Sequence, residues 1–131
     1  MGAINRAVAH AEWKAATVLA GAAIEALLLW RLAAQPPTNA QINAAISSVV
    51  TNGNLRKQPD SDRERWSLSE FVEVARELKI IKDKTVSAAR LCNSYRNLIH
   101  PGRALRLGEQ CNRGTALLAV AALELVVSDS P

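Results

Sequence analysis

The chain has 131 residues, of which 49% are hydrophobic and only 4% aromatic, and its formal net charge is +4 at pH 7. This length allows one domain, residues 1–131, with a sizeable core, but not two domains. The two cysteines, Cys92 and Cys111, stand in no CxxC motif and in no Cys/His metal spacing. We therefore expect no metal site, no redox dithiol and no cofactor, and two free thiols without a signal peptide predict a cytoplasmic protein.

The first expected helix spans about residues 4–34 and is the most hydrophobic part of the chain. Between Ala15 and Trp30 it is apolar nearly all round, so we expect neighbours on several sides, and the small residues 20–23 would admit a helix or a second subunit closely. Charges interrupt the run 15–29, which is shorter than the roughly 20 residues of a membrane span, so we predict a core helix and no membrane partner. A stripe at helical spacing consists of Ile4, Val8, Ala11, Ala15, Val18, Ala22, Ala26 and Leu29.

Capping boxes mark the start of two further helices. In this motif a hydroxyl residue and a Gln or Glu three positions later bond each other's backbone N–H groups. Thr38 with Gln41 opens a helix at 39–51, just after Gln35-Pro36-Pro37 ends the first one. Its inward residues are Ile42, Ala45, Ile46 and Val49. Residues 54–66 read as a charged surface loop with a short helical turn, anchored by Trp66.

Ser67 with Glu70 forms the second capping box and opens a third helix. We expect its core side to comprise Leu68, Phe71, Val72, Ala75 and Leu78, and its solvent side to comprise Glu73, Arg76, Glu77 and Lys79. Asp83 is the expected cap of a fourth helix, from residue 84 to about 99. The apolar side of that helix is Ala88, Leu91, Cys92, Tyr95, Leu98 and Ile99.

A last helix is expected from about residue 109 to 127, followed by a frayed tail at 128–131. Its core residues are predicted to be Leu117, Leu118, Val120, Ala121, Leu125 and Val126. Because every expected element is a helix and the connections are short, we predict an all-α, up-and-down bundle of about five helices. Glu25 and Glu124 lie among apolar residues, and we expect each to take part in a structural ion pair.

The positive charge is concentrated late in the chain. Residues 90–113 contain five arginines and one acid, Glu109. The arginines are Arg90, Arg96, Arg103, Arg106 and Arg113. A local excess of arginine suits a phosphate-bearing partner such as RNA, and the alternative is an ordinary solvated basic face.

Arg96 and His100 are four residues apart, which stacks them one turn apart if both are helical. Histidine can exchange a proton near neutral pH, and the planar guanidinium of arginine suits phosphate. The pair is therefore sufficient for metal-free chemistry on a phosphodiester. The alternative is an ordinary helix C-terminus, which Pro101-Gly102 would end and where cations complement the helix dipole.

These stretches resemble the HEPN superfamily. The resemblance rests on Val18-Leu19-Ala20-Gly21-Ala22-Ala23-Ile24-Glu25-Ala26-Leu27-Leu28 in the first helix and on Tyr95-Arg96-Asn97-Leu98-Ile99-His100-Pro101-Gly102-Arg103. Members of that superfamily are small helical bundles, often homodimeric. Many are metal-independent ribonucleases of toxin–antitoxin and other defence systems, and others are inactive scaffolds. The family motif is an Arg, usually with a polar residue next, and a His after four to six intervening residues. Here Arg96-Asn97 and His100 match it with three residues between Arg and His.

The resemblance implies roles for individual residues. His100 would act as base toward an RNA 2′-hydroxyl or as acid toward the leaving 5′-oxygen, Arg96 would stabilise the transition-state charge, and Asn97 would orient phosphate or imidazole. The products would be 2′,3′-cyclic phosphate and 5′-hydroxyl ends. Flanking substrate contacts would come from Asn93, Tyr95, Arg103 and Arg106 in a cleft between two subunits. The alternatives are a non-catalytic homodimer that binds an antitoxin, another partner protein or nucleic acid, and a bundle that binds a nucleotide or small ligand.

Overall fold

The computed structural model describes residues 13–34, 36–97 and 113–129 of the chain. The elements are α2 (Trp13–Ala33), α3 (Asn39–Thr51), the 3-10 turn η1 (Arg63–Arg65), α4 (Leu68–Glu77), α5 (Asp83–Asn97) and α7 (Arg113–Asp129). The described ranges hold five α-helices and no strand, which confirms the all-α prediction. The parts of the expected helices at 4–12, 98–99 and 109–112 lie outside the described residues.

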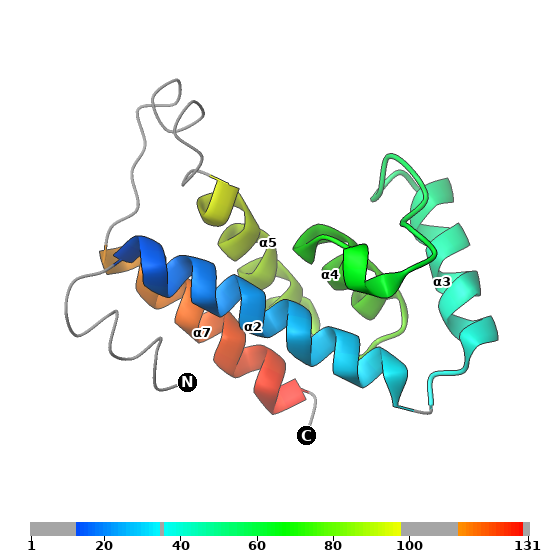
Figure 1. Ribbon diagram of the computed structural model, residues 1–131, viewed down its shortest axis with the longest axis horizontal. Helices are drawn as coiled ribbons and strands as arrows, with labels where there is room; N and C mark the ends of the chain where they lie inside the picture. Colours follow the sequence, from blue (N-terminus) through cyan, green and yellow to red (C-terminus); the bar gives the residue numbers. More distant parts are fainter. Residues whose placement is uncertain (1–12, 35, 98–112, 130–131) are drawn as a thin grey trace.

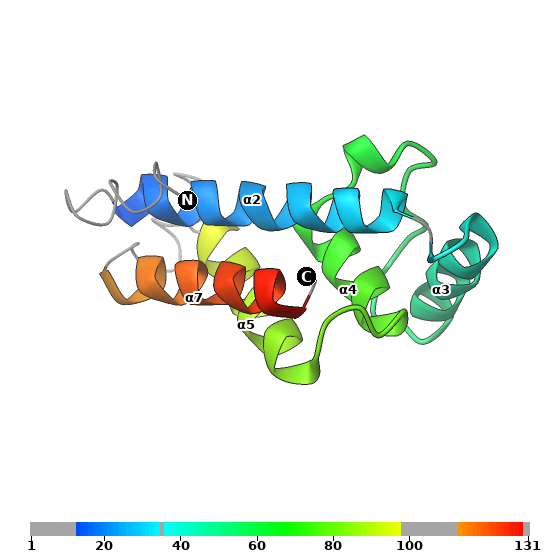
Figure 2. The same ribbon diagram turned by 90° about the horizontal axis from the view of Figure 1, so that it is seen from below.

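Three long helices form the body of the molecule (Figures 1 and 2). α2 and α7 lie side by side and run in the same direction, and α5 runs the opposite way against them. The short helix α4 packs on α2 and α5, and α3 lies beyond the end of α2, across the direction of the long helices. As a result, the last turn of α5 lies toward the end of the bundle where α2 and α7 begin.

The two predicted capping boxes are present and set where α3 and α4 begin. The Thr38 N–H donates to Gln41 Oε1 at 2.8 Å, and the Gln41 N–H donates to Thr38 Oγ1 at 3.2 Å. The equivalent distances for Ser67 and Glu70 are 2.8 and 3.3 Å. Each box satisfies two backbone N–H groups that a helix start otherwise leaves without a partner.

Trp66 fixes the charged loop to the core, as predicted. Its side chain is 4% exposed, its ring centroid lies 5.3 Å from that of Phe71, and its Nε1–H donates to the Asp60 carbonyl at 2.6 Å. The expected helical turn in the loop is η1. From this turn Arg63 donates to Asn39 Oδ1 at 2.8 Å and ties the loop to the start of α3.

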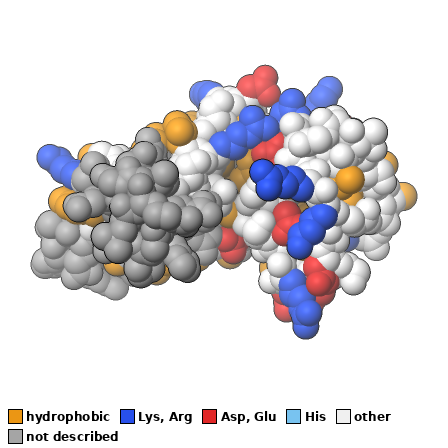
Figure 3. All heavy atoms as spheres, turned by 90° about the horizontal axis from the view of Figure 1, so that it is seen from above, with side chains coloured by type: hydrophobic (Ala, Val, Ile, Leu, Met, Phe, Trp, Pro, Cys, Tyr) orange, Lys and Arg blue, Asp and Glu red, His pale blue; other side chains and the backbone are white. Residues whose placement is uncertain are grey.

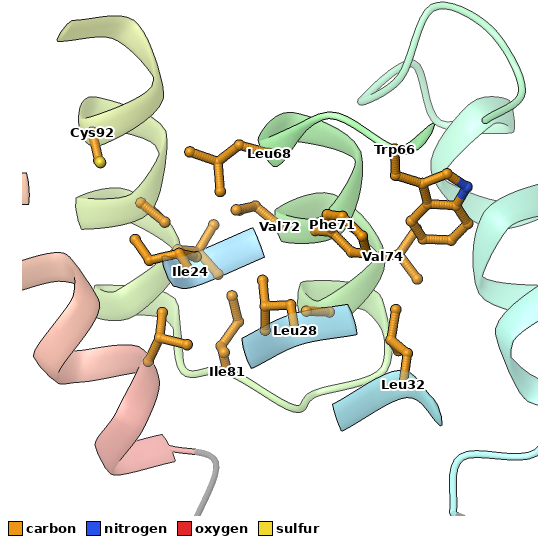
Figure 4. Close-up of a cluster of buried hydrophobic side chains, with 14 of the residues drawn as sticks. Ile24, Leu28, Leu32, Trp66, Leu68, Phe71, Val72, Val74, Ile81 and Cys92 are labelled. Carbon is orange, nitrogen blue, oxygen red and sulfur yellow. The ribbon is translucent and has the colours of Figure 1, made fainter. Parts of the chain in front are cut away.

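The core is organised around one side of α2. Every fourth residue of this helix is fully buried: Ala16, Ala20, Ile24, Leu28 and Leu32. Figure 4 shows Ile24, Leu28 and Leu32 facing side chains of α4, including Phe71, Val72 and Val74. Toward the start of α2, Ala16 packs against Ala116 of α7, so two small residues meet where the helices approach closely.

The predicted stripe on α2 is wrong about which side is buried. Val18, Ala22 and Ala26 are exposed and Ala15 and Leu29 are half-buried. The reason is that this helix is apolar all round, so hydrophobic periodicity cannot select the side that α4, α5 and α7 will cover. The fully buried side is offset from the predicted one by about half a turn.

The predicted core faces of α5 and α7 are also partly wrong. On α7 the buried residues are Ala116, Ala119, Ala122, Leu123 and Val126, whereas Leu117 is 44% exposed and Ala121 is exposed. Alanines are buried there because they let α7 approach its neighbours closely, and the larger leucines lie at the edges. On α5 the buried residues are Thr85, Val86, Ala89 and Cys92, whereas Leu91 is 44% exposed. α7 extends through Ser128 and Asp129, two residues of the expected tail, so the prediction that the tail begins at 128 is wrong.

The length and hydrophobicity of α2 fit two environments, a protein core and a membrane. Residues Ala15–Ala33 are long and apolar enough to cross a membrane by length and composition, a longer segment than the run 15–29 considered above. A core helix of a soluble protein passes the same test, and α2 is fully buried along one side. The cytoplasmic location therefore stays a prediction.

Candidate functional site

The predicted catalytic residues lie at and beyond the end of α5. The backbone of Tyr95, Arg96 and Asn97 is helical, as predicted, and forms the last described turn of this helix. One turn earlier Asn93 is half-buried and Ser94 is exposed. The side chains of Tyr95, Arg96 and Asn97 are outside the description, and His100, Arg103 and Arg106 lie outside the described residues.

The start of α5 is held by the far end of α7. Asp129 Oδ2 accepts the Lys82 N–H at 2.8 Å and the Thr85 hydroxyl at 2.6 Å. This carboxylate binds the N–H of Lys82, the residue just before the helix, as a capping-box glutamate binds the N–H of the N-cap residue, but it comes from 47 positions later in the chain. Partial burial raises the pKa of Asp129, but the bonds from Lys82 and Thr85 and the charges of Lys82 and Lys84 outweigh it, so its pKa lies below the ordinary value.

This contact corrects the predicted cap. Asp83 is the first residue of α5 and belongs to its first turn, where its negative charge is favourable near the positive end of the helix dipole. Lys82 is the residue just before the helix, and its N–H is bound by Asp129. A contact between residues so distant in sequence leaves no local pattern by which it could be predicted.

The middle of α5 is fixed to α4 by a bidentate ion pair. Arg90 donates from Nε to Glu73 Oε2 at 3.0 Å and from Nη2 to Glu73 Oε1 at 2.7 Å. The Glu73 side chain is 6% exposed and the Arg90 side chain is 49% exposed. The hydrogen bond to Glu73 raises the pKa of Arg90 above its ordinary value. This fork geometry fixes the rotation and the height of α5 relative to α4.

The prediction that Glu73 faces solvent is therefore wrong. Residues 71–75 of α4 are all buried, because the helix is covered on more than one side by its neighbours. Glu77, also assigned to the solvent side, is half-buried and accepts a hydrogen bond from the Ser48 hydroxyl at 2.8 Å. Arg90 was predicted as part of a phosphate-binding excess, but its guanidinium is engaged inside the molecule.

The two acids predicted to form ion pairs lie in different settings. Glu25 is half-buried on α2, and Glu124 is exposed on α7. Their assignment to structural ion pairs stays a prediction.

Arg113, the last arginine of the basic segment, is exposed at the first residue of α7. Arg113 thus lies toward the same end of the bundle as the last turn of α5, and its side chain is open to solvent.

A hollow of about 540 Å³ lies elsewhere, between the end of α2, α3 and the end of α4. Its polar rim includes Arg31, Gln41, Glu77 and Lys79. Arg31 donates to the Pro36 carbonyl at 2.7 Å, and Gln41 is part of the capping box of α3. Arg31 and Gln41 are thus engaged within the fold, and the hollow is separate from the end of α5.

The described part of the surface carries charges of both signs and no cluster of metal-binding side chains. Among the described side chains on the face seen in Figure 3, basic groups are interspersed with acidic ones and form no stripe of a single sign. Within 13–34, 36–97 and 113–129 no group of three or more His, Cys, Asp or Glu side chains could hold a metal ion. No protein-family model matches the chain, and no curated protein and no solved structure is significantly similar to it.

Proposed function

We propose that this chain is a cytoplasmic, nucleic-acid-associated protein of HEPN-like type, in which the end of α5 and the segment after it cleave RNA without a metal ion. One observation supports the proposal most. The last turn of α5, which carries Arg96 and Asn97, lies toward the end of the bundle where α7 begins with the exposed Arg113. Groups that suit phosphate and that are distant in sequence therefore share one end of the molecule.

The rigidity of α5 supports the same assignment. A catalytic group acts efficiently only when its supporting element is fixed, because small displacements of reacting atoms cost large factors in rate. α5 is held at its start by Asp129 and in its middle by Glu73, both through hydrogen bonds of 3.0 Å or less. In the proposed reaction Arg96 stabilises charge on the phosphate, Asn97 orients it, and His100 transfers the proton.

The proposal is tested by incubating a mixed-sequence single-stranded RNA with the protein in EDTA. The matched variants are His100→Ala and His10→Ala, since these are the two histidines of the chain. We expect cleavage by the wild type and by His10→Ala, and a loss of at least about 100-fold in His100→Ala, the lower range of a general acid–base contribution. Equal cleavage by all three proteins, or cleavage abolished by EDTA, would refute the assignment.

A second candidate is a non-catalytic HEPN-like protein that binds nucleic acid or a partner protein such as an antitoxin. The observation that favours it is the spacing of the motif, because three residues separate Arg96 from His100 whereas the family motif has four to six. This candidate predicts RNA binding without cleavage. We expect such binding to weaken with salt and with Arg113→Ala, whereas Arg65→Ala, an exposed arginine on η1, would leave it unchanged.

A further inference from the structure

The hollow between the end of α2, α3 and the end of α4 has the size and lining of a small-molecule site. Its volume of about 540 Å³ lies within the roughly 300–1,000 Å³ typical of ligand pockets. It lies at the other end of the molecule from the last turn of α5 (Figure 1). Its charged lining residues are Arg31, Glu77 and Lys79. Its apolar lining residues are Pro37, Ala44, Ala45, Leu78 and Ile80.

Arg31 keeps one edge of its guanidinium without a partner. Its Nη1 donates to the Pro36 carbonyl at 2.7 Å, which restrains the side chain at the end of α2. Its Nε and Nη2 make no hydrogen bond or ion pair within the described part of the chain. In Arg90 the same Nε and Nη2 edge holds the Glu73 carboxylate through two hydrogen bonds. Arg31 thus retains the edge that binds a carboxylate elsewhere in this fold.

Lys79 adds a second cation to the lining, at a position where its backbone is strained. α4 ends with the Ile80 N–H donating to the Ala75 carbonyl and the Lys79 N–H donating to the Arg76 carbonyl, both at 3.0 Å. The residue at the Lys79 position of such a helix end is left-handed and most often glycine, and Lys79 has φ 59°. Lys79 is exposed and forms no ion pair with a described acid. Backbone strain of this kind is concentrated at binding and active sites, which marks Lys79 as a candidate ligand contact.

Glu77 brings the opposite charge to the same lining. Its Oε1 accepts the Ser48 hydroxyl at 2.8 Å, which ties the carboxylate to α3. Glu77 is half-buried and forms no ion pair with a described cation. The hollow is therefore lined by two cations and one acid that are not paired with one another, together with an apolar surface.

We infer that the hollow binds a small amino acid with an apolar side chain. The α-carboxylate of the ligand binds Arg31 and Lys79, its α-ammonium binds Glu77, and its side chain packs on the apolar lining. A zwitterion meets both signs of charge, whereas a simple carboxylate leaves Glu77 without a partner and a simple amine leaves both cations without one. This site is additional to the proposed function and does not depend on it.

Titration of ¹⁵N-labelled protein with L-phenylalanine tests the site, with the amide shifts followed by NMR and no RNA present. For a ligand this small, a dissociation constant on the order of 1 mM is expected. We expect saturable shifts at the amides that line the hollow and none in the last turn of α5. The absence of saturable shifts up to about 20 mM, or shifts confined to other residues, would overturn the inference.

Two analogues of phenylalanine separate the contributions of its charges. 3-Phenylpropanoate lacks the ammonium group, and 2-phenylethylamine lacks the carboxylate. We expect each analogue to bind at least about 10-fold more weakly than phenylalanine, because each leaves charged groups of the lining without a partner. Equal affinities for phenylalanine and 3-phenylpropanoate would overturn the assignment of the ligand as an amino acid.

Three variants connect the binding to the named side chains. Lys79→Gly should weaken phenylalanine binding by about 5-fold or more although it relieves the backbone strain, so a higher Tm excludes unfolding as the cause. Glu77→Gln keeps an acceptor for Ser48 but removes the charge, and it should weaken the binding of phenylalanine but not of 3-phenylpropanoate. Lys57→Ala, at an exposed lysine of the charged loop, is the matched control and should bind like the wild type. Unchanged phenylalanine binding in both Lys79→Gly and Glu77→Gln would overturn the inference, and because no measurement uses RNA, its failure is distinguishable from failure of the ribonuclease proposal.

Discussion

The ion pair between Glu73 and Arg90 predicts a large effect from a single substitution. Arg90→Met keeps most of the aliphatic stem but removes both donors, which lie 3.0 and 2.7 Å from the carboxylate oxygens of Glu73. Glu73, only 6% exposed, would then hold a charge that neither water nor the described side chains around it can satisfy well. Removing one partner of a buried ion pair costs about 3–5 kcal/mol of unfolding free energy. Because Arg90 is 49% exposed, solvent already screens this pair, and we expect a loss of about 2–3 kcal/mol.

Urea denaturation followed by circular dichroism measures this loss of unfolding free energy. For a chain of this length a loss of 2–3 kcal/mol corresponds to a fall in Tm of roughly 6–12 °C. The double variant Glu73→Leu with Arg90→Met removes both charged groups and should return to within about 1 kcal/mol of the wild type, because no buried charge is left without a partner.

The control for this prediction is the exposed pair of Asp62 and Arg65. Its closest atoms are 3.9 Å apart and its side chains are 55% and 74% exposed, so Arg65→Met should change stability by less than about 0.5 kcal/mol. The reasoning would be refuted if Arg90→Met were as stable as the wild type, or if the double variant were as unstable as the single one.

Three further predictions concern the helix ends and the contact of α7. Asp129→Ala should cost about 1 kcal/mol of unfolding free energy at pH 7. The folded-state pKa of Asp129 is lowered, so its contribution is complete well above the ordinary aspartate pKa and is lost as pH falls through the lower folded-state pKa. Urea titrations should therefore show the gap between variant and wild type closing in the acid range. Lys79 has φ 59°, in the left-handed region, where a side chain is strained and glycine is not. Lys79→Gly should therefore raise the unfolding free energy by about 0.5–1 kcal/mol, and a lower Tm would contradict this. Ala119→Leu should cost about 1–3 kcal/mol, because Ala119 is fully buried, while Ala121→Leu on the exposed side of the same helix should be nearly neutral; equal Tm values for the two variants would show that α7 is not closely packed.

Helix starts could be predicted from the sequence because their signals are local. Thr38 with Gln41 and Ser67 with Glu70 each place the donor and the acceptor three residues apart, so the pattern and the contact are the same. The bounds of α3 at 39 and 51 were predicted for this reason. The anchoring of Trp66 was predictable because it is the one aromatic side chain of the charged loop 54–66.

The buried faces of α2 and α7 could not be predicted in the same way. Both helices are apolar on nearly all sides, so the choice of face depends on which neighbours arrive, not on periodicity. At their contact small residues such as Ala16 and Ala116 are buried, and Leu117, which hydrophobicity alone favours as a core residue, is 44% exposed. Where two helices approach closely, small apolar side chains such as alanine are favoured over larger ones such as leucine.

The groups that fix α5 were missed because their partners are distant in sequence. Glu73 and Arg90 are 17 positions apart, and Thr85 and Asp129 are 44 positions apart. Of the candidate site, the helical backbone through Asn97 was predicted correctly, since Asp83 to Asn97 forms one helix. The roles of Arg96, Asn97 and His100 depend on chemistry, and activity measurements are their direct test.

The most direct test of the central proposal is whether cleavage requires the RNA 2′-hydroxyl. A single-stranded oligonucleotide is first cleaved by the wild type in EDTA to map the main site, and the nucleotide 5′ to that bond is then replaced by its 2′-deoxy form. The proposal predicts that cleavage there disappears and that the unmodified RNA yields 2′,3′-cyclic phosphate and 5′-hydroxyl ends. Continued cleavage at the deoxy position would contradict the proposed chemistry.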